Sequence, residues 1–248
     1  MSSSWENSNE WYDRTVGAKG HYFHEKIILP GVLRLLGLSI HSRLLDLACG
    51  QGILSRHIPK EVHYTGIDLS PSLIRAAKSY KPSKTQQFIV GDITQTLEIG
   101  KNFTHAAVIL ALQNIADPLA LFKNIHTHMI QKGRCILVLN HPCYRIPRQS
   151  SWHLDSVKKI QYRRIDRYLS PLKIPIQTHP SQKEHSVETF SFHFPLSAYS
   201  QWLKESGFMI ELIEEWCSDK TSQGGAAAYE NRSRKEFPLF LTLSLIKI

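Results

Sequence analysis

The sequence predicts a single α/β domain built on a parallel sheet that helices cover on both faces. A chain of 248 residues fits one large domain more readily than two small ones. From Arg43 onward, short runs of Leu, Val and Ile alternate with amphipathic stretches, a pattern typical of βαβ units. No internal repeat is present, which excludes solenoids and propellers.

Composition narrows the class of protein further. Hydrophobic residues make up 42% of the chain, which is ample for a packed core and excludes a disordered protein. The four cysteines form no CxxC pair, so we expect free thiols and neither a disulfide framework nor a zinc module. No apolar run approaches the roughly 18 residues of a membrane span, and the polar N-terminus lacks the features of a signal peptide. We therefore expect a cytoplasmic protein that does not bind membranes.

The net charge of +9 is spread over the central and following segments and forms no polybasic tail. Such an excess fits an acidic small molecule or a phosphate-bearing partner about as well as RNA.

The elements of the sheet follow in order. Ser70-Pro71 and Asp117-Pro118 each place a capping side chain before a proline at the first helical position, which predicts helices through Ser79 and Ile130. Gly133 is expected to end the second helix and begin the next strand. The predicted strands are 43–48, 62–68, 86–91, 104–112 and 133–140.

The flanking segments differ from this core. Residues 21–38 carry apolar groups at helical spacing, with Pro30 at a kink or a new helix start. Residues 142–195 are proline-rich, basic and irregular, which predicts a substrate-covering insertion. A helix at 196–206, a strand at 208–217, a polar loop to about Glu236 and a last strand at 237–247 follow. We thus divide one domain, 1–248, into a cap (1–41), a cofactor-binding core (42–141), an insertion (142–195) and a closing segment (196–248).

A glycine turn follows the first predicted strand, in LLDLACGQG. Gly50 and Gly52 allow a tight turn and close approach of a ligand to the backbone, and a following helix would offer free N–H groups. Asp68 ends the second strand, where a carboxylate can accept both hydroxyls of a ribose, and Gly91-Asp92 follows the third. Because the carboxyl ends of parallel strands share one edge, these groups should converge on a nucleotide-like ligand.

The residue before the glycines selects the ligand. Asp46 would repel a pyrophosphate but favour a cation, and Ser55 stands where a nicotinamide-binding turn would have its third glycine. Both residues disfavour a nicotinamide-dependent oxidoreductase.

DLACGQG, Asp68, Asp92 and ALQNIADP together resemble the successive motifs of class I S-adenosylmethionine-dependent methyltransferases, over roughly residues 21–141 and the closing helix and strands. The resemblance implies a Rossmann-like, seven-stranded, mostly parallel sheet with an antiparallel last strand. It also implies S-adenosylmethionine as the cofactor, with S-adenosylhomocysteine as product. The N-terminal helical cap and the insertion after strand five, expected from the residues themselves, complete the predicted fold. The cofactor-binding residues expected from it are His21, Tyr22, Asp46, Ala48, Cys49, Gly50, Gly52, Asp68, Leu69, Ser70, Gly91, Asp92, Ile93, Leu110, Ala111, Leu112 and Gln113. The whole chain also resembles a narrower, largely uncharacterised bacterial group of methyltransferases.

The methyl acceptor is less defined. His141, at the end of strand five, is the best-placed general base, followed by Tyr144, although a hydrogen-bonded structural histidine is an equal alternative. His21 and His24 lie one turn apart, but no carboxylate or cysteine completes a metal site, so no metal is expected. The basic insertion favours arginines that face an anionic group. The candidate acceptor-binding residues are Tyr12, His24, Arg148, Trp152, Arg163, Arg164, Arg167, Tyr168, Asn231 and Arg232.

Two classes of nucleic-acid methyltransferase are disfavoured. Cys143 could be a nucleophile as in RNA cytosine-C5 enzymes, but the Pro-Cys expected after strand four is absent, as is the base-gripping motif of nucleobase amino-methyltransferases. The run from Lys158 to Tyr168 interleaves basic and aromatic residues, which fits a phosphate backbone or an ordinary amphipathic lid helix. We expect a small anionic or aromatic acceptor, with an RNA or protein methyltransferase as the alternative, followed by an oxidoreductase or a non-catalytic nucleotide-binding module.

Overall fold

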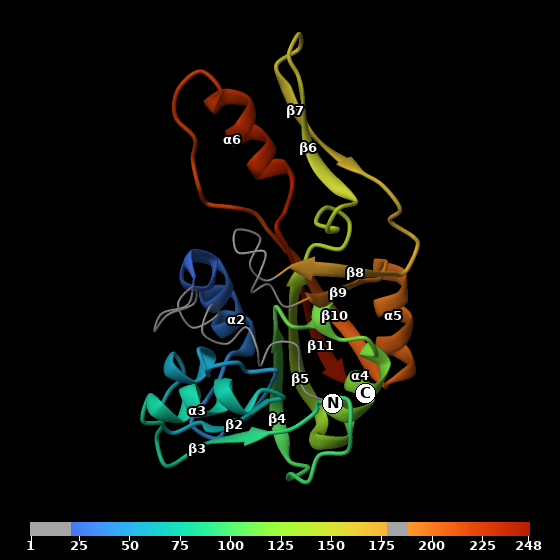
Figure 1. Cartoon of the computed structure of the whole chain (residues 1–248). Helices are drawn as coiled ribbons and strands as arrows, with labels where there is room; N and C mark the ends of the chain where they lie inside the picture. Colours follow the sequence, from blue (N-terminus) through green and yellow to red (C-terminus); the bar gives the residue numbers. More distant parts are fainter. Residues whose placement is uncertain (1–20, 178–187) are drawn as a thin grey trace.

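A seven-stranded sheet is the centre of the molecule, with the strand order β10-β11-β5-β4-β1-β2-β3 (Figure 1). The computed structural model describes residues 21–177 and 188–248. β11 runs antiparallel to both of its neighbours, and the remaining neighbouring pairs are parallel. The strands are β1 (Arg43–Leu47), β2 (His63–Asp68), β3 (Gln86–Val90), β4 (Phe103–Ile109), β5 (Met129–Asn140), β10 (Phe208–Trp216) and β11 (Phe240–Lys247).

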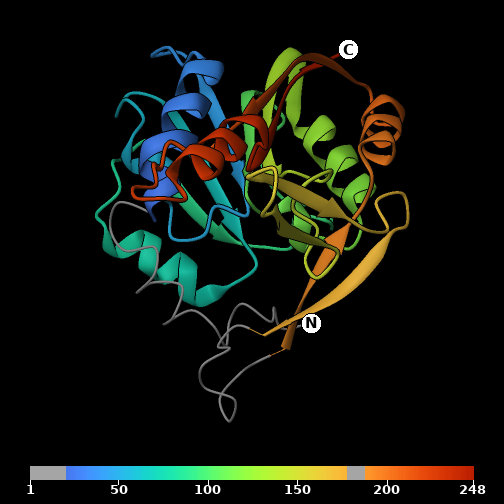
Figure 2. The same cartoon turned by 90° about the horizontal axis from the view of Figure 1, so that it is seen from above.

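Helices cover both faces of the sheet (Figure 2). One face packs against α2 (Leu29–Leu36) and α3 (Pro71–Ser79), and the other packs against α4 (Pro118–His128) and α5 (Leu196–Glu205). The predicted caps are confirmed: the Ser70 side chain accepts from the backbone N–H of Leu73, and Asp117 accepts from that of Ala120. The strand directions and the helices on both faces confirm the predicted α/β class and the antiparallel last strand.

The leading helix has two parts. A π-helical turn, η2 (His24–Ile28), passes directly into α2, whose second residue is Pro30. This agrees with a new helix start at the proline. Gly37 ends α2 in the left-handed conformation, at φ 56°.

Two local predictions in the core are wrong. The glycine turn leads into a single 3-10 turn, η3 (Leu54–Arg56), and no α-helix follows it, so no helix N-terminus is available to a ligand there. α4 ends at His128, and β5 begins at Met129 instead of Gly133. The physical reason is an irregularity in the β4–β5 pairing, where Lys132 adopts a left-handed conformation inside the strand.

The insertion is regular, contrary to the sequence-based expectation. It contains two antiparallel hairpins, β6 (Ser150–Asp155) with β7 (Ile160–Ile165), and β8 (Leu172–Gln177) with β9 (Glu188–His193). The run from Lys158 to Tyr168 thus contains a strand and no lid helix. The alternation of Ile160, Tyr162 and Arg164 with Gln161 and Arg163 is a strand period.

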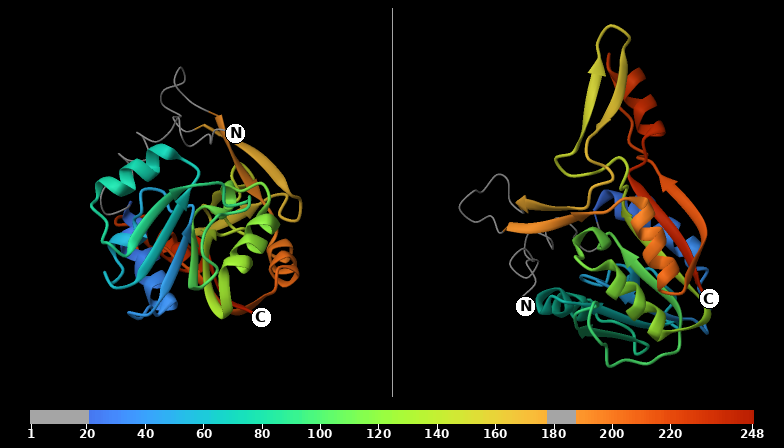
Figure 3. Two further views of the ribbon diagram at one scale, coloured as in Figure 1. Left: turned by 90° about the horizontal axis from the view of Figure 1, so that it is seen from below. Right: turned by 90° about the vertical axis from the view of Figure 1, so that its right-hand side faces the viewer.

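The predicted polar loop before the last strand is also wrong in part, because it contains α6 (Ala227–Glu236). An i,i+4 ion pair between Glu230 and Arg234 supports this helix, and Asn231 exchanges two hydrogen bonds with the backbone of Ser222. α6 lies beside the β6–β7 hairpin, and the two project together from the sheet (Figure 3). We call this unit the projecting lobe (β6, β7 and α6).

Candidate functional site

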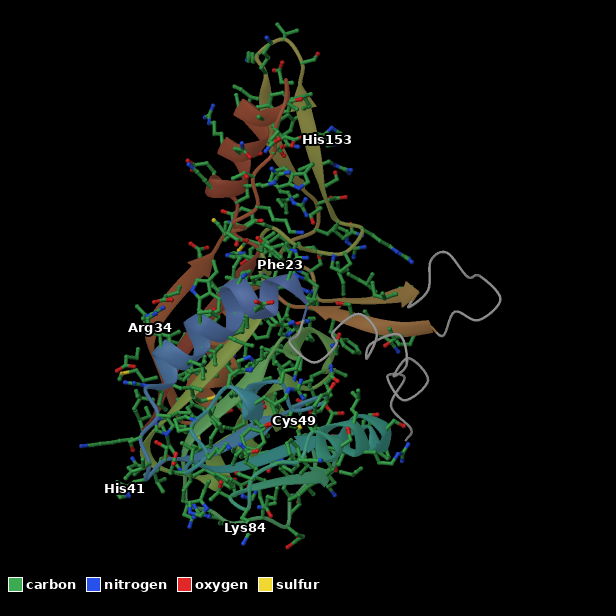
Figure 4. All side chains as sticks on the ribbon, turned by 90° about the vertical axis from the view of Figure 1, so that its left-hand side faces the viewer. Phe23, Arg34, His41, Cys49, Lys84 and His153 are labelled. Carbon is green, nitrogen blue, oxygen red and sulfur yellow. The ribbon has the colours of Figure 1, made fainter. Side chains whose placement is uncertain are left out.

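Three carboxylates lie at the carboxyl ends of adjacent strands. Asp46 is on β1, Asp68 ends β2, and Asp92 follows β3. Because β1, β2 and β3 are neighbours and parallel, these residues share one edge of the sheet, as predicted. The turn that follows β1 can be located in Figure 4 by the label on Cys49.

Asp68 is held rigidly. Its Oδ2 accepts from the backbone N–H of Gly50 and its Oδ1 from that of Ser70, each at 2.9 Å. The residue is 8% exposed. These two bonds fix the orientation of the carboxylate at the end of β2.

Asp46 has a different environment. It is buried, and its Oδ2 accepts a hydrogen bond of 2.6 Å from the hydroxyl of Tyr64, which is itself buried. Burial raises the pKa of Asp46 to about 7, with a smaller contribution from Asp68, against the effect of the Tyr64 hydrogen bond. A carboxylate in this state gains most from a neighbouring cation, which would restore its charge.

The glycine turn that follows β1 depends on left-handed backbone conformations. Ala48, Gly50 and Gly52 have φ values of 57°, 57° and 72°. A Cβ on Gly52 would come within 2.7 Å of the Phe88 ring. Gly52 is therefore required by packing against Phe88 as well as by its φ. Burial raises the pKa of the Cys49 thiol, which makes it a poor nucleophile.

The rest of the predicted cofactor edge presents apolar surface and one further carboxylate. Leu69 is 39% exposed directly after β2. Asp92 uses Oδ1 to accept from the backbone and the hydroxyl of Thr94. Beyond β4, Leu110 has a φ of 52°, and its carbonyl accepts from Nε2 of Gln113 in η4 (Leu112–Asn114). Gly91, Ile93, Ala111 and Leu112 lie in the same loops.

The N-terminal candidate residues do not form one group: His21 and His24 lie together, whereas Tyr22 points elsewhere. The rings of His21 and His24 lie 4.2 Å apart, and burial lowers the pKa of His24 to about 4. Tyr22 is exposed, and its hydroxyl donates to Asp219 instead of turning to the sheet edge. Phe23, between the sheet and the projecting lobe in Figure 4, contacts Phe240 edge to face. Tyr12 lies outside the described residues.

His141 is buried with both ring nitrogens occupied. Nδ1 accepts from the backbone N–H of Cys143, so the proton lies on Nε2, which is 2.6 Å from the Glu215 carboxylate. Burial lowers the pKa of His141, while Glu215 acts in the opposite direction. This geometry favours the structural interpretation, in which His141 ties the end of β5 to β10. The Tyr144 ring packs on His141 and on Phe237.

A cleft lies beside this edge, at the carboxyl ends of β4 and β5 and under β9. The empty space between its lining residues is about 330 Å³, part of which is open to solvent. Arg145 and His193 were both missed by sequence reasoning, because nothing in the sequence distinguishes Arg145 from the other arginines of the insertion and β9 was not predicted. The lining residues are Gln113, Leu139, Asn140, Pro142, Arg145, Pro147, Ser191, Phe192, His193, Phe194 and Tyr199.

The candidate acceptor residues of the insertion are not among the residues that line this cleft. Arg163 lies over the ring of Trp152 and donates to the carbonyl of Tyr144 and the hydroxyl of Ser150. Arg164 is exposed and pairs with Asp166. Tyr168 accepts from the backbone N–H of Leu196, and Asn231 holds the loop before α6. Arg148, Arg167 and Arg232 are exposed.

Comparison with known proteins identifies the fold. Residues 45–137 match the family model described as a methyltransferase domain. The crystal structure of an S-adenosylmethionine-dependent methyltransferase from Mesorhizobium loti superposes with a TM-score of 0.67, at 24% identity, over 88% of this chain and 96% of that one. Residues 45–137 thus match a methyltransferase domain, and the chain has the fold of class I methyltransferases. The cofactor of this class is S-adenosylmethionine, as the resemblance implied.

Curated relatives match the methyltransferase domain over part of their length. Demethylmenaquinone methyltransferase of Chlamydia muridarum is 30% identical over 112 residues, which cover 44% of this chain and 48% of the relative. Juvenile hormone acid O-methyltransferase of Bombyx mori is 29% identical over 147 residues, 53% of this chain and 50% of the relative. The chain thus matches about half the length of these relatives.

The residues at the sheet edge fit the cofactor of this class. Asp68 presents a carboxylate in a fixed orientation, and the buried Asp46 carboxylate favours a cationic group. Across the described ranges, no helix is long and apolar enough to cross a bilayer.

Proposed function

We propose that this protein transfers the methyl group of S-adenosylmethionine to a small acceptor bound in the cleft beside the methyltransferase domain's cofactor edge. The observation that carries the proposal is the convergence of Asp46, Asp68 and Asp92 at the ends of β1, β2 and β3, next to a separate cleft at the ends of β4 and β5. One edge of the sheet can therefore hold a donor and an acceptor side by side.

Each group has a distinct task in this proposal. Asp68 accepts the ribose hydroxyls, Asp92 and Leu69 contact the adenine, and Asp46 faces the cationic methionine end. The bound cofactor supplies a methyl group on a positively charged sulfur, so the protein's main contribution is to position the acceptor and exclude water. The buried walls of the cleft, including Leu139 and Tyr199, serve that exclusion.

A small acceptor is favoured by the size of the cleft and by two relatives whose names specify small-molecule acceptors, demethylmenaquinone and juvenile hormone acid. The exposed arginines of the projecting lobe, among them Arg164, leave RNA as the alternative partner.

Titration calorimetry with S-adenosylmethionine, S-adenosylhomocysteine, NADH and a short RNA tests these assignments. We expect micromolar binding of the two adenosyl compounds and none of NADH. RNA binding that weakens steeply between two salt concentrations would support the alternative acceptor class. Binding of NADH, or of no adenosyl compound, would reject the proposed function.

A further inference from the structure

Arg145 places a positive charge in the cleft, and no acidic side chain among the described residues pairs with it. The backbone N–H of Arg145 donates to the carbonyl of His141, so the residue is fixed in the turn that follows β5. Its side chain lines the cleft. It forms no ion pair with any residue in the described ranges 21–177 and 188–248.

The guanidinium is anchored along one side only. Nη1 donates to Oδ1 of Asn140 at 2.7 Å and to the carbonyl of Leu239 at 3.4 Å, and the group lies 5.5 Å from the ring centroid of Phe240. Within the described part of the chain, Nε and Nη2 have no hydrogen-bond partner. These two nitrogens form the edge that binds both oxygens of a carboxylate.

The surroundings of Arg145 favour the binding of an anion. Burial lowers the pKa of Arg145, and the nearby Arg163 adds to that shift, so the environment disfavours an unpaired charge. The ring of His21 lies close enough to Arg145 that the guanidinium lowers its pKa, a shift due mainly to burial. Arg145 and Arg163 together make this place electropositive.

The remainder of the cleft is suited to an apolar body. Leu139, Pro142, Phe192 and Phe194 line it, and Tyr199 is buried at its wall. One guanidinium edge with a single charge matches a monoanion with two oxygens better than a phosphate dianion, which would need further donors.

We propose that Arg145 binds the carboxylate of the acceptor through Nε and Nη2, so that the acceptor is a small organic acid with an apolar body. This inference rests on the proposed function, because it concerns the acceptor of the same site. Arg163 and Arg164, which the sequence favoured for this task, are engaged in the projecting lobe instead.

The test observes the Nε–H resonance of Arg145 by NMR in protein saturated with S-adenosylhomocysteine. The resonance is assigned by its loss in Arg145→Lys, and the probes are phenylacetate, phenylacetamide, acetate, acetamide and inorganic phosphate. We expect a saturable shift of this resonance with the two acids and none with the amides. We expect phenylacetate to bind Arg145→Gln about 10- to 100-fold more weakly, as for loss of charge-assisted hydrogen bonds.

The matched control is Arg164→Gln, which removes the same charge from the projecting lobe and should leave phenylacetate affinity unchanged. Equal shifts with acids and amides, no shift with either acid, or preference for phosphate would overturn the proposal. The comparison of acids with amides uses the wild-type protein, so it holds even where Arg145→Gln fails to fold. Failure to bind S-adenosylhomocysteine in the first step rejects the proposed function instead.

Discussion

Asp46 and Asp68 lie on neighbouring strands, but their surroundings prepare them for different tasks. Two backbone N–H groups fix Asp68, whereas Asp46 has one hydroxyl partner and a pKa raised to about 7 by burial. The first carboxylate is thus preorganised for neutral hydroxyls, and the second gains its charge when a cation arrives.

Replacing Asp68 with Ala should weaken S-adenosylhomocysteine binding about 10- to 100-fold, because acceptors for two ligand hydroxyls are lost. Calorimetry measures the change. Asp166→Asn is the control, because Asp166 is an exposed carboxylate of the insertion that pairs with Arg164. Unchanged affinity in Asp68→Ala would show that the cofactor lies elsewhere.

Asp46 predicts a pH dependence of cofactor binding. Below its pKa of about 7 the carboxyl is protonated and does not attract a cation, and above it the carboxylate does. S-adenosylmethionine should therefore bind about tenfold more tightly at pH 8 than at pH 6. Asp46→Asn should flatten the dependence, and an equally steep profile in that variant would assign it to another group.

Asp46 also makes the stability of the cofactor-free protein depend on pH, but stability falls with rising pH whereas cofactor binding strengthens. Since the pKa of Asp46 is raised on folding, the folded state binds more protons than the unfolded state between about pH 4 and 7. Its contribution to the free energy of unfolding consequently falls as pH rises through that window. Bound cofactor should offset the loss.

At the scale of elements, α3 begins at the cofactor edge of the sheet, and Ser70 caps its N-terminus. The Ser70 hydroxyl accepts from the backbone N–H of Leu73, and Ser70 itself donates its N–H to Asp68. Cap and cofactor residue are thus coupled through one residue.

Ser70→Ala should lower the free energy of unfolding by about 1 kcal/mol, the usual cost of a lost N-cap. Denaturant unfolding measures it. Ser70→Thr, which keeps a capping hydroxyl and adds no charge, is the matched control and should recover most of the loss. If the Ala variant is as stable as the wild type, the cap contributes nothing to folding.

Elements with a strong local signal could be predicted from the sequence, and elements that depend on distant contacts could not. Ser70-Pro71 and the run RLLDL carry their own caps and hydrophobic pattern, so α3 and β1 were placed to within a residue. β6 and β7 have little core of their own, and they are ordered by pairing with each other and by α6. The role of Arg145 could not be predicted, because its surroundings come from β5, β9 and β11, which are far apart in the sequence.

The whole molecule divides into a two-faced sheet and the projecting lobe. The two hydrophobic core clusters contain residues of the sheet and its helices and none of β6, β7 or α6. The lobe is held by local contacts, including the Ser233 hydroxyl with Gln161 and the Trp152 ring against Phe237.

Hydrogen exchange should therefore show amides of β6, β7 and α6 opening together and well before those of β5 and β11. Trp152→Ala should accelerate exchange in α6 as well as in β6, while leaving β5 unchanged. Leu154→Ala, at a half-exposed position of the same strand, is the control. Independent exchange of α6 and the hairpin would contradict a shared unit.

The position of β11 between β5 and β10 has a consequence for synthesis of the chain on the ribosome. β5 ends at Asn140, and its partner begins at Phe240, about 100 residues later. At typical translation rates this interval is roughly 5 to 20 s. During that time the edge of β5 is open in the nascent chain, and so is that of β10 once it has been made. The edges of β5 and β10 stay unpaired until β11 has been made, so the nascent polypeptide depends on protection of those edges until then.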